Sequence, residues 1–162
     1  MSMGNDNVTG SAAKVQHALR ERGLETVVRE MPASTRTAKE AAAAIGCTVG
    51  QIAKSLVFRG AATGKAVLVM ASGTNRVNEA ALAAVVGEPV ERATPEFVRD
   101  ATGYAIGGVP PVGHDQALPV WMDRDLFLHE RIWAAAGTPF AVFEITPLEL
   151  QRVTGAAMLT VK

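Results

Sequence analysis

One lysine and one loop rich in glycine and proline have the residue types from which a reaction site can be built. Lys54 begins the apolar run K-S-L-V-F, and the loop Tyr104–Asp115 reads Y-A-I-G-G-V-P-P-V-G-H-D. Proline fixes φ and glycine has no Cβ, so such a loop can bring bare backbone N–H groups close to a ligand. An ammonium group can hold carbonyl, hydroxyl or phosphate oxygens. We therefore expect Lys54 to lie opposite this loop.

Gly107 and Gly108 are the candidate hydrogen-bond donors of the loop. Their amides could stabilise the negative oxygen that develops when an ester carbonyl is attacked, and losing one such donor costs about 3 kcal/mol of barrier. A tight turn that needs positive φ is the alternative explanation for the two glycines. Lys54 has an alternative as well, as a solvated lysine at the start of a strand.

Five further residues are candidates for substrate binding: Ser72, Gly73, Pro110, His114 and Asp125. Ser72 and Gly73 end a predicted strand, where ligand contacts often gather, although simple strand termination explains them equally well. Asp125 could instead cap a short helix. His114 precedes an aspartate, but adjacent residues do not usually face each other, and no serine or cysteine nucleophile motif accompanies them.

The composition fits one globular domain without extended contacts to duplex nucleic acid. The chain has 162 residues, of which 48% are apolar and 20% charged, and its formal net charge is zero. A long non-specific contact with a duplex needs many phosphate contacts, which a neutral chain does not favour. A small patch for a single-stranded end remains open. The three histidines are too scattered to suggest a metal site.

The termini and the cysteine content indicate a cytoplasmic protein. Cys47 is the only cysteine, so no intrachain disulfide can form and a reducing compartment is expected. Residues 1–10 are small and polar, lack the apolar segment of a signal peptide and are expected to be flexible. Residues 11–162 then form a single domain.

The order of the expected elements favours a mixed sheet. Capping residues and apolar spacing predict helices at 11–22, 37–46, 79–86 and 96–101 and after Thr146, with short helical turns near 52 and 125. Apolar runs predict strands at 24–30, 54–58, 66–70, 89–91, 119–123, 131–135, 141–145 and 158–161. Many neighbouring strands are joined by turns too short for a crossover. We therefore expect an α+β fold, with a largely antiparallel, barrel-like mixed sheet and surrounding helices.

Several of these segments together resemble the YbaK family, also called the prolyl-tRNA-synthetase-associated or aminoacyl-tRNA deacylase domain. They are T-A-K-E-A-A at 37–42, Q-I-A-K-S-L-V-F at 51–58, Ser72-Gly73, I-G-G-V-P-P at 106–111, and the late G-T-P-F followed by P-L-E-L. Their order is that of the family, and they cover the chain from about residue 12 to its end. The resemblance implies a compact α/β fold around a mixed, barrel-like sheet.

The resemblance also implies an activity. Family members hydrolyse the ester that joins a wrongly attached amino acid to tRNA, and the lysine that matches Lys54 is their main catalytic residue. For this chain it implies a trans-acting deacylase for Cys-tRNA(Pro) or Ala-tRNA(Pro), with His114 contacting the terminal adenosine or the amino acid. Mischarged tRNA and prolyl-tRNA synthetase are the implied partners, and no cofactor, metal or membrane is needed. The alternative is a non-catalytic module that binds a nucleotide, an RNA end or a protein in the same cleft.

Overall fold

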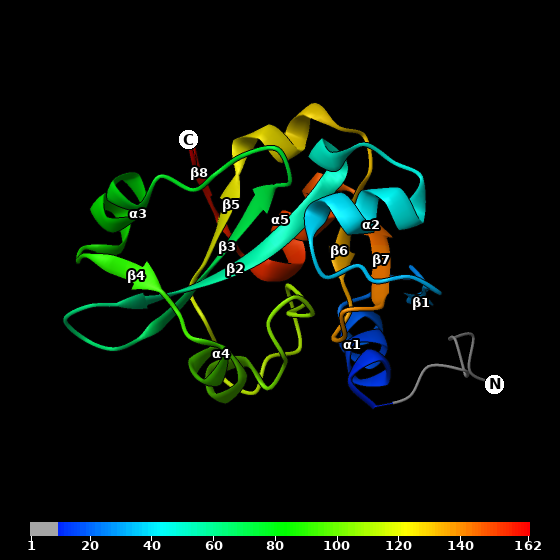
Figure 1. The fold of residues 1–162 in the computed structure, drawn as a ribbon, viewed down its shortest axis with the longest axis horizontal. Helices are drawn as coiled ribbons and strands as arrows, with labels where there is room; N and C mark the ends of the chain where they lie inside the picture. Colours follow the sequence, from blue (N-terminus) through cyan, green and yellow to red (C-terminus); the bar gives the residue numbers. More distant parts are fainter. Residues whose placement is uncertain (1–9) are drawn as a thin grey trace.

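The computed structural model describes residues 10–162, and within them five α-helices surround one mixed sheet (Figure 1). The predicted flexible segment 1–10 lies outside the described residues, except for Gly10, which begins the first helix. The α-helices are α1 (Gly10–Glu21), α2 (Ala38–Ile45), α3 (Glu79–Val86), α4 (Pro95–Thr102) and α5 (Pro147–Thr154), and the 3-10 helices are η1 (Val49–Gln51) and η2 (Arg124–Leu128). The strands are β1 (Arg29–Glu30), β2 (Ile52–Gly60), β3 (Ala66–Ser72), β4 (Val90–Arg92), β5 (Val120–Asp123), β6 (Ile132–Ala135), β7 (Ala141–Ile145) and β8 (Ala157–Leu159). None of the described helices is long and apolar enough to cross a membrane.

The strands form an open sheet in the order β1-β7-β6-β2-β3-β5-β8, with β4 paired to the end of β2. Four ladders are antiparallel and three are parallel. The longest ladder is the predicted hairpin of β2 and β3. The prediction of a mixed, largely antiparallel sheet with surrounding helices is therefore confirmed, although the sheet does not close into a barrel.

One edge of β2 lacks a strand partner over four residues. On this edge β6 pairs only with Ile52 and Ala53, and β4 pairs only with residues 58–60. Residues 54–57 therefore lie between two partner strands without belonging to either ladder, although the carbonyl of Val57 accepts from the amide of Ala93, just after β4, at 3.4 Å. We call this interruption the β2 gap. It leaves an opening in the sheet that starts at Lys54.

Two helices cover opposite faces of the sheet beside the β2 gap. Helix α1 packs the fully buried Val15 and Leu19 into one cluster with Phe143 of β7. Helix α2 packs Ala41 into a separate cluster with Trp133 of β6. Side chains of a strand alternate between its two faces, so β6 and β7 contribute to both clusters. The helices thus shield the faces, while the gap is left at a strand edge.

Capping residues fix the N-termini of α2, α3, α4 and α5. The side chains of Thr37, Asn78, Thr94 and Thr146 each accept a hydrogen bond from a backbone amide in the first turn, as the sequence predicted. Helices α2 and α3 end at Gly46 and Gly87, both in the left-handed conformation that favours glycine. Because these signals are local, they fix the helix boundaries to within a residue or two.

The predicted strand 24–30 is wrong over most of its length, since only Arg29 and Glu30 pair with β7. The side chain of Gln16 on α1 takes the place of a strand partner. Its amide group donates to the carbonyl of Thr26 at 3.0 Å, and its Oε1 accepts from the amide of Val28 at 2.8 Å. The segment is therefore held by a helix, and the short β1 forms one end of the sheet.

Asp123, at the end of β5, is a buried carboxylate that joins three segments. Its oxygens accept hydrogen bonds from the Ser72 amide at 3.0 Å, Asn75 Nδ2 at 2.8 Å and the Asp125 amide at 2.9 Å. The residue is 1% exposed, so water cannot replace these bonds. Asp123 therefore fixes the end of β3, the turn after it and the start of η2.

Replacing Asp123 with alanine is expected to lower the free energy of unfolding by about 2–5 kcal/mol, because each buried donor left without an acceptor costs about 1–3 kcal/mol. Urea denaturation followed by circular dichroism measures this loss. Asp100→Ala, which removes an exposed carboxylate on α4, is the matched control and should cost less than about 0.5 kcal/mol. A loss below about 1 kcal/mol for Asp123→Ala would contradict the role assigned to its hydrogen bonds.

Candidate functional site

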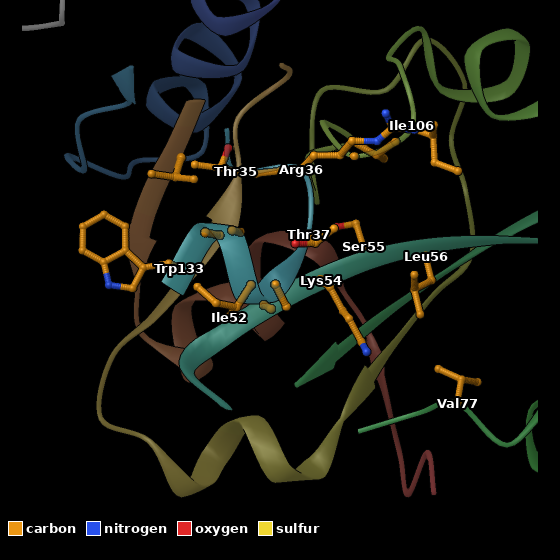
Figure 2. A pocket seen from close by; sticks show the side chains of 18 of the residues that line it. Thr35, Arg36, Thr37, Ile52, Lys54, Ser55, Leu56, Val77, Ile106 and Trp133 are labelled. Carbon is orange, nitrogen blue, oxygen red and sulfur yellow. The ribbon is translucent and has the colours of Figure 1, made fainter. Parts of the chain in front are cut away.

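A cavity of about 380 Å³ opens at the β2 gap (Figure 2). Its walls come from the segment before α2, from β2, from the loop after β3, from β4, β6 and β7, and from the glycine-proline loop. Lys54 and Gly107 both line it. Lys54 and Ser55 project to opposite sides of β2, as alternating strand residues must. The cavity therefore extends around a strand edge and has a Lys54 side and a Ser55 side.

Lys54 is a half-buried cation without a carboxylate partner. Within the described part of the chain it makes no ion pair and no side-chain hydrogen bond. Burial lowers the pKa of Lys54, the nearby guanidinium of Arg92 lowers it further, and that of Arg76 adds a smaller effect. The carboxylate of Asp123 acts in the opposite direction but does not cancel these effects. A bound anionic or strongly polar ligand would stabilise the ammonium form of Lys54 and offset these effects.

Three arginines add positive charge to the wall of the same cavity: Arg36, Arg76 and Arg92. None of them forms an ion pair with any of the residues 10–162, whereas Arg59, on the hairpin, lies 3.5 Å from Glu91. Sequence analysis did not single out Arg76 or Arg92. They are distant from Lys54 in sequence and are brought to the cavity by the turn after β3 and by β4. The wall thus has four cations and no carboxylate to neutralise them.

Gly107 lies in the cavity wall in a conformation that requires glycine. Its φ is +86°, and a Cβ built on it would come 2.5 Å from Cγ of Arg36. The glycine-proline loop therefore packs closely against the segment before α2. The structure brings Gly107 and Lys54 to one cavity, although no hydrogen bond or ion pair joins the two residues.

The structure corrects the prediction that Gly108 offers a free amide. Its N–H donates to the carbonyl of Ala105 at 3.0 Å, and its carbonyl accepts from the amide of Gly137 at 2.9 Å. A Cβ at this position would meet backbone atoms of Thr138 at 2.7–2.9 Å. Gly108 is therefore a turn residue packed against another loop, and it does not line the cavity.

Three residues expected near the substrate hold the fold together outside the cavity wall. The hydroxyl of Ser72 donates to the carbonyl of Gly50 at 2.7 Å, and Gly73 packs without room for a Cβ against η1. Asp125 accepts from Asn75 at 2.8 Å and lies 3.2 Å from Lys162, and these two contacts lower its pKa. Strand termination, the alternative named for Ser72 and Gly73, agrees with their positions. The alternative named for Asp125, helix capping, is wrong, because Asp123 caps η2 and Asp125 lies in its first turn.

Pro110 and His114 also lie outside the cavity wall. His114 Nε2 is 2.7 Å from the carbonyl oxygen of Pro110, and its ring meets that of Tyr104 edge-on at 6.5 Å. Burial lowers the pKa of His114 despite this hydrogen bond. The histidine therefore stabilises its own loop in the neutral form and is not positioned for acid–base chemistry at Lys54.

The rest of the cavity wall is mainly apolar and includes Trp133, which is only 7% exposed. Three hydroxyl residues line it as well, namely Thr35, Thr37 and Ser55. Sequence analysis did not single out Thr35 or Ser55, and Thr37 caps α2. Across residues 10–162, no group of three or more acidic, histidine or cysteine side chains is arranged to hold a metal ion.

Comparisons with known proteins agree on one family. The model of the aminoacyl-tRNA editing domain matches residues 32–153. YwhH, an uncharacterised protein of Bacillus subtilis (strain 168), is 32% identical over 126 residues, which is 78% of this chain and 80% of YwhH. The proline–tRNA ligase of Solidesulfovibrio magneticus is 36% identical over 94 residues, which is 57% of this chain but only 16% of the ligase.

A solved structure extends the likeness to nearly the whole chain. It is described as a proposed trans-editing enzyme for prolyl-tRNA synthetase and is 52% identical to this chain. The superposition covers 96% of this chain and 99% of that chain, with a TM-score of 0.90. The fold built around the β2 gap is therefore shared with a protein assigned to tRNA editing.

Replacing Arg92 with glutamine is expected to raise the pKa of Lys54, because it removes the largest electrostatic contribution that opposes the ammonium form. The pKa should stay below the ordinary lysine value, since burial is unchanged. A pH titration of the Lys54 side-chain NMR signals measures the shift. Arg99→Gln, on the exposed side of α4, is the control and should leave the pKa unchanged. An unchanged or lower pKa in Arg92→Gln would contradict the coupling.

Proposed function

The chain belongs to the aminoacyl-tRNA editing domain family, and on this basis we propose that it is a trans-acting aminoacyl-tRNA deacylase. Its substrate would be a tRNA carrying the wrong amino acid, of the Cys-tRNA(Pro) or Ala-tRNA(Pro) type. Prolyl-tRNA synthetase, which would release such a tRNA, is the natural partner. The likeness to a proline–tRNA ligase and to a trans-editing enzyme supports this assignment.

The observation that carries the proposal is the unneutralised positive charge around the cavity. Lys54, Arg76 and Arg92 line it without an ion-pair partner in the described chain, and the first of these is partly desolvated. The 3′ end of a tRNA is a single strand with a phosphate at each nucleotide, so it can supply the missing negative charge. A patch of this size suits a strand end, in line with the zero net charge of the whole chain.

In the proposed reaction, water adds to the carbonyl carbon of the aminoacyl ester, and the bond between that carbon and the ribose oxygen breaks. The ribose oxygen takes up a proton, which leaves a free amino acid and an uncharged tRNA. Lys54 holds and polarises the ester or the neighbouring phosphate, and its ammonium stabilises the oxygen that becomes negative. Gly107 is the remaining glycine of the loop whose amide can assist.

No side chain in the cavity wall is an evident general base. The free hydroxyl of the terminal ribose therefore positions the attacking water in this proposal. Catalysis then depends on orientation and on fixed charges, which are the contributions that a rigid cavity supplies best. The alternative function, binding without turnover, requires the same charges and is separated from this one by experiment.

Replacing Lys54 with alanine is expected to slow single-turnover deacylation of Cys-tRNA(Pro) or Ala-tRNA(Pro) by about 10²–10³-fold, because the fixed charge at the ester is lost. Lys65→Ala, an exposed lysine on the β2–β3 hairpin, is the matched control and should keep the wild-type rate. A Lys54→Ala protein that folds and deacylates within about threefold of the wild type would remove Lys54 from the mechanism. Tight binding of uncharged tRNA by a wild-type protein that deacylates none of a panel of mischarged tRNAs would favour the non-catalytic module.

The enzymatic rate should also fall at high pH, because the active ammonium form of Lys54 is lost as the pH rises through its lowered pKa. This loss is expected at a lower pH than an ordinary lysine would give. Rates are corrected for the hydrolysis that hydroxide causes without enzyme. Lys54→Arg keeps its charge throughout this range, so its residual rate should show no such fall. A parallel decline in both proteins would assign the pH dependence to another group.

A further inference from the structure

The turn between β3 and α3 carries Arg76 between two buried residues. Asn75 is 8% exposed and Val77 is 7% exposed, whereas Arg76 is exposed and lines the cavity. Val77 belongs to the apolar cluster that also contains Phe58 of β2. Both neighbours of Arg76 are therefore anchored in the protein interior, and the position of the arginine depends on them.

Asn75 is the polar anchor of this turn. Its Nδ2 donates to Asp123 Oδ2 and to Asp125 Oδ2, both at 2.8 Å. Its backbone amide donates to the carbonyl of Ser72 at 2.9 Å. Hydrogen bonds to a carboxylate are about twice as strong as those between neutral groups. Asn75 therefore ties the turn to β5 and η2 more firmly than a bond between neutral groups would.

The carboxylates that bind Asn75 leave the charge of Arg76 unpaired. Asp125 lies 3.2 Å from Lys162, and the oxygens of Asp123 accept from the backbone amides of Ser72 and Asp125 as well as from Asn75. Within residues 10–162, neither carboxylate forms an ion pair with Arg76. The guanidinium thus stays available for a ligand, although the two carboxylates determine where its turn lies.

Arg76 lies on the same side of β2 as two other cations. Its charge lowers the pKa of Lys54, and Figure 2 shows the next residue, Val77, on the Lys54 side of the strand. Arg92 pairs with Phe58, which shares a face of β2 with Lys54 because side chains alternate along a strand. The cations from β2, β4 and the turn therefore border one side of the cavity.

We propose that Asn75 is a positioning residue, which holds Arg76 in the cavity wall so that its guanidinium binds a phosphate of the tRNA 3′ end. The proposal rests on the deacylase function and assigns two groups of that site to different steps, with Arg76 in substrate binding and Lys54 at the ester. A guanidinium offers paired donors that match the oxygens of a phosphate. A turn that is fixed before binding also avoids the cost of ordering it in the complex.

The test measures single-turnover deacylation of alanyl- or cysteinyl-tRNA(Pro), whichever the wild type hydrolyses faster, at rising enzyme concentration. Arg76→Gln is expected to raise the half-saturating enzyme concentration about three- to tenfold and to leave the maximal rate unchanged. The slope of log affinity against log salt concentration should become shallower by about 0.7, the value for one phosphate contact on a single strand. Asn75→Ala should cause the same two changes although it removes no charge, and should add nothing in the Arg76→Gln background.

Folding of each variant is followed by urea denaturation. Asn78→Ala is the matched control, because this asparagine of the same turn instead caps α3, accepting from the amide of Ala81 at 3.1 Å. It should lower stability and leave both the affinity and the salt slope unchanged. Asn75→Ser keeps one donor for the carboxylates and is the second variant if Asn75→Ala does not fold. It should change affinity and slope in the same direction, by less.

Two results would overturn the inference while leaving the deacylase function intact. One is a loss of affinity in Asn75→Ala that is equally large with and without Arg76, which would make Asn75 a structural residue only. The other is an unchanged salt slope in Arg76→Gln, which would mean that Arg76 contacts no phosphate. Inactivity of the wild type on every charged tRNA would instead defeat the deacylase function and this inference with it.

Discussion

The interruption of pairing along β2 is the constraint on which the rest of the site depends. A strand inside a sheet normally has both edges occupied, and its backbone is then inaccessible to a ligand. Here β6 and β4 each pair with one end of the same edge and leave residues 54–57 between them. On the other edge every residue of this segment pairs with β3. A cavity at such an edge can expose side chains from both faces of one strand.

Two consecutive residues of β2 present an ammonium group and a hydroxyl-bearing side chain to opposite sides of one strand. Lys54 projects to one side of β2 and Ser55 to the other, so consecutive residues serve different parts of one cavity (Figure 2). In the proposed function the Lys54 ammonium would hold the ester or a neighbouring phosphate of the nucleic-acid end. The strand edge that β6 and β4 leave free is the point at which both sides of β2 can be reached.

The sequence could predict what local signals determine. The caps at Thr37, Asn78, Thr94 and Thr146 and the β2–β3 hairpin depend on residues close in the chain, and the lysine and the glycine-proline loop were recognisable as motifs. The remaining features depend on contacts between distant segments. Gly107 and Gly108 are the same residue type, so the sequence does not distinguish their amides. Only the hydrogen bond from Gly108 to the carbonyl of Ala105 shows that the Gly108 amide is already used.

Distance in the chain also explains the other differences from expectation. The segment 24–30 has the composition of a strand, but a glutamine on α1 takes up its backbone hydrogen bonds. Arg76 and Arg92 reach the cavity through a turn and a short strand whose pairing no local pattern encodes. Ser72 and Asp125 carry typical site residue types, but the buried carboxylate of Asp123 draws them into a structural network.

Helix α1 completes the core but lies outside the part of the chain that matches the family. The match to the family begins at residue 32, so it omits α1, although Val15 and Leu19 on that helix are fully buried against the sheet. The residues of the cavity wall all lie beyond that point. The cavity wall and the helix that completes this side of the apolar core thus belong to separate stretches of the chain. Removal of α1 would therefore leave every residue of the cavity wall in the chain, but would uncover apolar side chains of β7, such as Phe143, to water.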